Sequence, residues 1–332
     1  MKRRTIMISL LALFLFPVAR IIGAETPLKK IMVGVPAMSL LQSPLLIAID
    51  SGAFKKYGMD VTAIVLGGPR LIQALVGDSI QFAQGVSSRT VPSAALGGAD
   101  AVLIASFTDK LLFTMHSAPE IKSMQDLNGK IVGVSGIGGS IDLATRMALR
   151  QVGLFPDKDV AIRSVGGVPE IVAALKGRII QAGTLSPPSS FVAENAGFKM
   201  IFDMTTLGVD YISSGLGTKR SSIASNREQV KYFLMGMIEG AKILKTNEEF
   251  SIRVLTKYTR ISDRNVLERS YNYMRPYFLK MPYPSLRAIK DTLDVLAREI
   301  PKAKDADPKE FVDTSVLREI EASGYVENLY SK

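Results

Sequence analysis

A glycine-rich turn between an apolar strand and an amphipathic helix is the stretch best suited to binding chemistry. Lys130–Val134 is a β-branched run typical of a buried strand, and Ser135–Ser140 follows it without a bulky polar side chain. Apolar residues then recur at helical spacing over Ile141–Leu149, with Gly153 as a stop and Ser140 as the predicted N-cap. Such a unit directs backbone N–H groups and the positive end of a helix dipole toward a ligand, which is the chemistry of anion binding.

The loop departs from both glycine-rich nucleotide motifs. Gly133–Ser140 has the spacing of a phosphate-binding loop, but Gly139 stands where that motif has its lysine. The dinucleotide pattern G-x-G-x-x-G fails because Ile141 occupies the position of the third glycine. A tight structural turn without a ligand is therefore the alternative interpretation of this loop.

The unit that contains the loop occurs twice. Lys30–Gln84 and Lys130–Thr184 resemble each other at a nearly constant offset of about 100 residues, with KIMVGV matching KIVGV and ALVGDSIQ matching ALKGRIIQ. Each copy is predicted to run strand, helix, strand, helix, strand, which implies a mainly parallel sheet with helices on its faces. Such sheets bind ligands at the carboxyl ends of their strands, so two units face to face would form a cleft between two lobes.

Short polar loops at the predicted carboxyl ends of strands would line that cleft. Pro36–Ser43 follows the first strand, and Gly85–Ser88 and Leu185–Pro188 follow corresponding strands of the two copies. Serine hydroxyls and backbone N–H groups at the following helices would bind the ligand. The predicted ligand-binding residues are Ser39, Ser43, Ser87, Ser88, Arg89, Ser135, Gly138, Gly139, Ser140 and Ser186.

The charge of these residues favours an anionic ligand. Arg89 would place a cation beside it, although a surface arginine in the first turn of a helix is the alternative interpretation. A site rich in N–H donors and poor in carboxylates suits a small sulfonate or carboxylate. Asp109, Asp203 or Asp210 would weaken this inference if it reached the cleft.

The first 24 residues are predicted to be a cleaved export signal. Lys2–Arg4 is a basic start, Ile6–Phe16 is uncharged and mostly apolar, and Gly23 and Ala24 offer small residues for cleavage. A membrane anchor is the alternative, but Arg20 ends the uncharged run short of the ~20 residues that a spanning helix needs. We therefore expect a soluble protein in the periplasm.

The composition excludes several kinds of chemistry. The chain has no cysteine, so a lipoprotein anchor, disulfides and thiolate catalysis are excluded. Its one histidine, His116, lacks evident partners for nucleophilic catalysis, and no cluster has metal-ligand spacing. We expect no catalytic residue, metal or other cofactor. Without the export signal the formal charge falls from +10 to +6, with no basic stripe that would bind nucleic acid.

The order of the elements predicts two lobes joined by two crossings. Residues 25–116 and 208–332 are expected to form the first lobe, and residues 117–207 the second. The crossings are placed near Thr114–Pro119 and Met204–Tyr211. Apolar stripes at helical spacing then predict a helical C-terminal part of the first lobe. The stripes lie in Asn226–Lys245, Arg264–Leu279, Ser285–Ile300 and Phe311–Ser323.

Five segments, taken in order, carry a resemblance to a known family. They are Ser43–Val61, Ala74–Ala83, Ile121–Val134, Asp159–Ile179 and Phe311–Tyr330. Together they resemble the substrate-binding proteins of nitrate/sulfonate/taurine-type ABC importers and the related thiamine-precursor binders. The resemblance implies a type II periplasmic-binding fold, in which two α/β lobes close on a ligand. It also implies delivery of the small solute to an ABC permease that is driven by an ATPase. We expect the protein to be a monomer.

Some features depart from the family or leave alternatives open. Gln81 and Gln181 stand where members often carry aspartate, with little expected effect on the fold. Thiamine-pyrimidine synthases of the family use a cysteine- and histidine-rich segment for iron chemistry, and this chain has none. A periplasmic enzyme on the same fold would need a nucleophile with a base, a carboxylate pair or a metal cluster. A ligand-sensing partner of a membrane receptor would bind without transport.

Overall fold

Each copy of the repeat supplies three neighbouring strands of a five-stranded sheet. The computed structural model describes residues 27–67 and 69–331. The sheet orders are β2-β1-β3-β10-β4 and β7-β6-β8-β5-β9, and the first three strands of each come from one repeat copy. The first sheet contains β1 (Lys29–Val35), β2 (Met59–Val65), β3 (Phe82–Val86), β4 (Val102–Ser106) and β10 (Gly215–Thr218). The second contains β5 (Thr114–Ser117), β6 (Ile131–Val134), β7 (Ala161–Ser164), β8 (Ala182–Leu185) and β9 (Lys199–Asp203).

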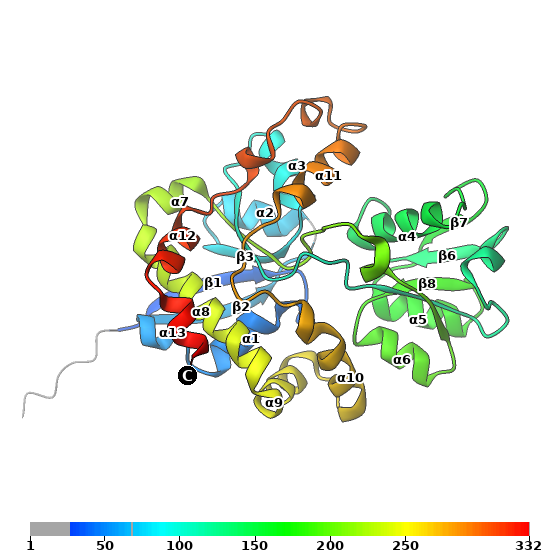
Figure 1. The fold of residues 1–332 in the computed structure, drawn as a ribbon, viewed down its shortest axis with the longest axis horizontal. Coiled ribbons are helices and arrows are strands. Elements are labelled where there is room, and N and C mark those ends of the chain that lie inside the picture. Colours follow the sequence, from blue (N-terminus) through cyan, green and yellow to red (C-terminus); the bar gives the residue numbers. More distant parts are fainter. Residues whose placement is uncertain (1–26, 68, 332) are drawn as a thin grey trace, which may run out of the picture.

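The sheets are mainly parallel, as predicted, but each has one reversed strand. β10 runs antiparallel to its neighbours β3 and β4, and β5 runs antiparallel to β8 and β9. Both reversed strands lie outside the repeat. The predicted class, two α/β lobes with a helical C-terminal part, is confirmed (Figure 1).

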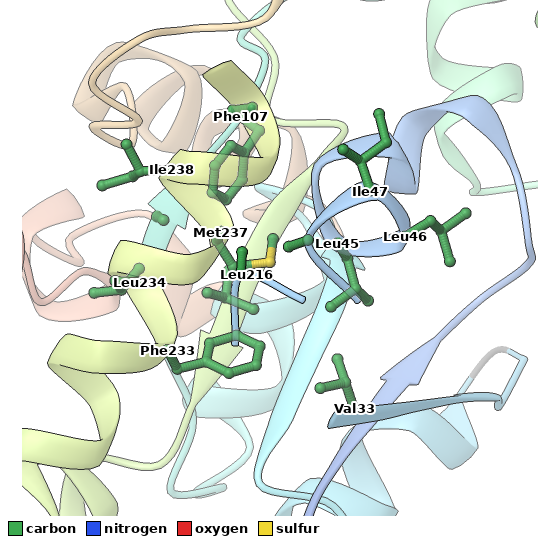
Figure 2. Packing of buried hydrophobic residues seen from close by; sticks show 14 of the residues in the cluster. Val33, Leu45, Leu46, Ile47, Phe107, Leu216, Phe233, Leu234, Met237 and Ile238 are labelled. Atoms are coloured by element: carbon green, nitrogen blue, oxygen red, sulfur yellow. The ribbon is translucent and has the colours of Figure 1, made fainter. Parts of the chain in front are cut away.

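Helices cover both faces of the first sheet. The side chains of α1 and α8 pack on one face, and those of α2, α3 and α11 pack on the other. Figure 2 shows Leu45 of α1 and Phe233 and Met237 of α8 gathered with Val33 of β1. Burial of each such side chain contributes roughly 1.5–3 kcal/mol. The helices are α1 (Ser43–Asp50), α2 (Pro69–Val76), α3 (Thr90–Leu96), α7 (Arg220–Ser225), α8 (Arg227–Thr246), α9 (Glu248–Thr259), α10 (Arg264–Met274), α11 (Leu286–Leu296), α12 (Ser315–Ala322) and α13 (Tyr325–Tyr330).

The second sheet is also covered on both faces. Ile141 and Ala144 of α4 (Ser140–Gln151) pack in one core cluster with Met115 of β5. The helices α5 (Val168–Lys176) and α6 (Ser189–Asn195) form another cluster on the opposite face. Because side chains alternate along a strand, Thr114 and His116 point toward α6 while Met115 points toward α4.

The first crossing comes earlier than predicted. β4 ends at Ser106 in the first sheet, and β5 begins at Thr114 in the second, so residues 107–113 form the crossing. The expected crossing at Thr114–Pro119, and with it the lobe boundary at residue 116, was therefore one strand too late. Thr114–Ser117 pairs with β8 and β9, which makes it a central strand of the second lobe.

The second crossing lies between β9 and β10, over residues 208–214, and overlaps the predicted position. The two crossings bind each other: the Tyr211 N–H donates to the Asp109 carbonyl at 2.8 Å. The Ser213 hydroxyl donates to the Lys110 carbonyl at 3.0 Å. The connection between the lobes is thus a hydrogen-bonded pair of segments.

The repeat extends to details of packing. A Cβ added at Gly34 would lie 2.7 Å from Ile80 Cδ1, and one at Gly133 would lie 2.4 Å from Ile180 Cδ1. In both copies the end of an isoleucine side chain packs directly against the glycine of the first strand. The described residues contain no helix long and apolar enough to cross a membrane. The predicted export signal, Met1–Ala24, lies outside these residues.

The two glutamines in place of aspartate have matching structural roles. The Met32 N–H donates to Gln81 Oε1 at 2.9 Å, and the Ile131 N–H donates to Gln181 Oε1 at 3.1 Å. Each glutamine thereby binds a backbone N–H of the first strand in its own repeat copy, which agrees with the small effect expected on the fold.

Candidate functional site

A cavity of about 750 Å³ lies between the two lobes. Pro36 follows β1, Ser87 follows β3 and Gly138 follows β6, and all three line it. The cavity is therefore at the carboxyl ends of strands from both lobes, where α/β sheets bind ligands. Its size is within the range of pockets for small molecules, roughly 300–1,000 Å³.

The turn before α4 forms the wall from the second lobe. Gly138 has φ +79°, a left-handed conformation that favours glycine. Its N–H donates to Asp142 Oδ2 at 2.8 Å, and Arg146 Nε donates to Asp142 Oδ1, also at 2.8 Å. Gly139 takes the N-cap position, so the prediction of Ser140 as N-cap is wrong. Asp142 reaches back to the turn instead, and the Ser140 side chain is left for another contact.

That contact is with a tyrosine in the second crossing. Ser140 Oγ lies 2.7 Å from the Tyr211 hydroxyl, which joins α4 to the segment between the lobes. Tyr211 is only 3% exposed, and burial raises the pKa of its hydroxyl, so the group stays neutral and can donate a hydrogen bond. The first N–H groups of α4, at Ser140 and Ile141, have no acceptor within the helix. Such N–H groups attract anions, and Ser140 lines the cavity.

The first lobe contributes the turn before α3. Ser87 Oγ accepts from the Thr90 N–H at 3.2 Å and from the Arg89 N–H at 3.3 Å, which holds the turn before α3 together. The Arg89 guanidinium reaches the cavity and donates to Glu299 Oε2 at 2.7 Å. A Cβ added at Gly138 would be 4.0 Å from Arg89 Nη2, so the guanidinium extends across to the α4 turn.

The structure brings half of the predicted residues together at the cavity: Ser87, Arg89, Gly138, Gly139 and Ser140. The lining does not include the other five, Ser39, Ser43, Ser88, Ser135 and Ser186.

Each of these five makes a hydrogen bond within the protein. Ser88 is buried and bonds Thr292 at 2.9 Å, Ser43 donates to the Leu40 carbonyl, and Ser39 pairs with Gln42. The Ser186 and Ser135 carbonyls accept hydrogen bonds from within the second lobe.

The carboxylates that could have reached the site are absent from its lining. Asp210 accepts from Lys110 Nζ and from the Ser285 hydroxyl, both at 3.1 Å. Asp203 accepts from Thr205 and from the Tyr273 hydroxyl, and the Asp109 carbonyl accepts from Tyr211. Arg89 is therefore the one charged side chain among the described residues that line the cavity.

The single histidine lies outside the cavity. His116 is fully buried, its Nε2 is 3.2 Å from Glu194 Oε1, and burial lowers its pKa. Within the described part of the chain, no group of three or more His, Cys, Asp or Glu side chains could hold a metal ion. Sequence reasoning missed Tyr211 and Glu299, which approach the site from distant segments.

Solved structures share the fold at low identity. The alkanesulfonate-binding protein SsuA from Xanthomonas axonopodis pv. citri, bound to MOPS, is 18% identical with a TM-score of 0.72. The alignment covers 87% of this chain and 99% of that one. The periplasmic nitrate-binding protein NrtA from Synechocystis PCC 6803 is 17% identical with a TM-score of 0.73, over 91% of each chain. These likenesses show a periplasmic-binding-protein fold.

Sequence comparison identifies the family. A protein of Brachyspira hyodysenteriae named “Putative ABC transporter periplasmic binding protein” is 24% identical over 157 residues. That match spans 45% of this chain and 45% of that protein, less than half of either. A family model described as NMT1/THI5 like matches residues 42–249, well over half of the chain. The chain therefore belongs to the NMT1/THI5-like family.

Proposed function

We propose that the protein is an extracytoplasmic receptor that captures a small organic anion between its lobes and delivers it to an ABC importer. The observation that carries this proposal is that Arg89 and the N-terminal turn of α4 line the same cavity and lie opposite each other. A guanidinium and first-turn N–H groups both attract anions, and no carboxylate among the described residues lines the cavity.

The rest of the lining favours an organic anion over an inorganic one. Leu71, Ile72 and Ile137 provide apolar surface, while Ser87 and Thr90 provide hydroxyls. A cavity of about 750 Å³ is large for nitrate but suits a sulfonate or carboxylate with a short apolar part. The family and the relatives named as periplasmic binding proteins support the transport role and the periplasmic location. Residues 1–24 would supply the export signal.

A thermal-shift screen of the purified protein tests the proposal, after native mass spectrometry has identified any copurified ligand. The screen should contain sulfonates, carboxylates, nitrate and organic cations. An anion at a hundred times its Kd adds ~2.7 kcal/mol to the free energy of unfolding. Such an anion should raise the melting temperature by a few degrees. Stabilisation by cations alone, or chemical conversion of a bound anion, would contradict a receptor for anions.

Replacing Arg89 with glutamine should weaken the binding of an anion found in this screen. Hydrogen bonds from a charged donor are worth ~1.5–3 kcal/mol, and ~1.4 kcal/mol is a factor of ten in Kd. Affinity measured by isothermal titration should therefore fall by roughly one to two orders of magnitude. Glu299→Gln is the matched control, because it removes the carboxylate partner of Arg89 and should leave anion affinity equal or higher. Unchanged affinity in Arg89→Gln would make Arg89 only a surface partner of Glu299.

A further inference from the structure

Helix α10 belongs to the first lobe but also contacts the second. It packs on α9 of the first lobe and on α6 of the second. Arg269 is central to the second contact: its guanidinium pairs with Glu194, donates to Asn195 Oδ1 at 3.2 Å, and lies 4.5 Å from the centre of the Phe191 ring. One arginine thus makes an ion pair, a hydrogen bond and a cation–π contact with α6.

Tyr273, one turn after Arg269, adds a second set of contacts. Its hydroxyl donates to Asp203 Oδ1 at 3.0 Å, and its ring meets Phe191 edge-on with centroids 6.2 Å apart. Asp203 is the last residue of β9, just before the second crossing. A residue of the first lobe is therefore bound to the point at which the chain leaves the second lobe.

The contact with α6 extends into the core of the second lobe. Glu194 Oε2 pairs with Arg269, and Glu194 Oε1 lies 3.2 Å from Nε2 of the buried His116 in β5. His116 is 0% exposed, so its hydrogen bond holds the Glu194 carboxylate in place against the sheet. Because Glu194 is already held in place, only the Arg269 side chain loses entropy when the ion pair forms. In an ordinary surface ion pair, both side chains lose it.

These contacts lie on the other side of the sheet from the cavity. In the second lobe, α6 covers the sheet face opposite α4, and α4 carries the cavity turn. Figure 1 shows α10 and α6 on one side of the crossings and α3, α11 and α4 on the other. The α10 contacts therefore cannot be part of the anion site.

We infer that α10 is a brace that sets the relative orientation of the two lobes through Arg269 and Tyr273. Any rotation about the crossings moves α6 and Asp203 relative to α10, because they belong to different lobes. The contacts exist only in the orientation described, so they stabilise it relative to every other orientation. This brace acts without ligand, and it does not depend on what the cavity binds.

The absence of cysteine makes a direct test simple. Spin labels on introduced cysteines at Val76, at the end of α2, and at Phe155, after α4, would report the distance between lobes. Both side chains are exposed, by 40% and 59%. Electron–electron double resonance on the ligand-free protein should show one dominant distance. In the double variant Arg269→Gln/Tyr273→Phe, the fraction of molecules that show a second distance between the labels should rise about tenfold, from about 1% to about 10%.

The matched control is Arg264→Gln, in the same helix. Arg264 pairs with Glu249 and Glu268, both in the first lobe, so this variant loses the same charge without touching α6. It should leave the distance distribution unchanged. The brace is overturned if the double variant gives the wild-type distribution. If the double variant folds poorly by thermal melt, Tyr273→Phe alone removes one hydroxyl, and the same criterion applies to it.

Discussion

Replacing Ser140 with aspartate is expected to lower the affinity for an organic anion by at least two orders of magnitude and to leave the fold intact. The new carboxylate would lie at the first turn of α4, where the anion is proposed to bind. The anion would lose the attraction of the helix end, ~0.3–2 kcal/mol, and hydrogen bonds worth ~1.5–3 kcal/mol each. Since ~1.4 kcal/mol is tenfold in Kd, these losses account for the expected change.

The fold should tolerate this aspartate for two reasons. A negative charge suits the positive end of a helix dipole. The Tyr211 hydroxyl, 2.7 Å from Ser140 Oγ and kept neutral by a raised pKa, can donate to the new carboxylate. The melting temperature without ligand should therefore barely change.

Ser140→Asn is the matched control for this prediction. It has almost the same shape as the aspartate and no charge, so its affinity by isothermal titration should stay within a few-fold of wild type. If the aspartate variant binds the anion as tightly as wild type does, the turn Gly138–Ser140 is structural only. If it gains affinity for a cation instead, the proposed charge of the ligand is reversed.

The sequence repeat predicted the fold because its signals are local. Each copy carries its own strands and helices, and the close contacts of Gly34 and Gly133 recur at equivalent places. The reversed strands β5 and β10 could not be placed in this way. A four-residue segment such as Thr114–Ser117 has no pattern that tells which sheet it joins, and its pairing with β8 depends on tertiary structure. That is why the first crossing was predicted one strand too late.

The difference between local signals and tertiary contacts also explains which site residues were predicted and which were not. Gly138 and Ser87 lie in turns at strand ends, and a turn at the carboxyl end of a strand is visible in the sequence. Ser88 follows Ser87 directly but points into the core toward Thr292, and only packing decides which of two adjacent serines faces the cavity. Tyr211 and Glu299 come from segments far along the chain, so no local pattern marks them.

Gly240→Ala is expected to destabilise the protein strongly. Gly240 is on α8, where α8 lies directly against α1. A Cβ there would lie 2.1 Å from the Pro44 carbonyl oxygen and 2.8 Å from Ala48 Cβ. Real Cβ atoms essentially never come this close, and the first obstacle is backbone, which cannot move aside like the end of a flexible side chain.

The α1–α8 interface cannot relieve this clash cheaply. Pro44 and Ala48 are in α1, whose Leu45, Leu46 and Ile47 are fully buried in the largest core cluster, so moving α1 would disturb the whole cluster (Figure 2). Overpacking in a close-packed core costs typically 1–3 kcal/mol, and this geometry should be at the upper end. At roughly 2–4 °C per kcal/mol, the melting temperature should fall by about 6–12 °C.

Gly67→Ala provides the control for Gly240→Ala. A Cβ at Gly67 meets no heavy atom of the described chain within 4 Å, so this variant should melt within about a degree of wild type. Circular dichroism melts of the two variants, without ligand, would decide the matter. If Gly240→Ala has the same melting temperature as Gly67→Ala, α1 and α8 can move apart at little cost in free energy. The close packing of α1 on α8 would then contribute little to the stability of the first lobe.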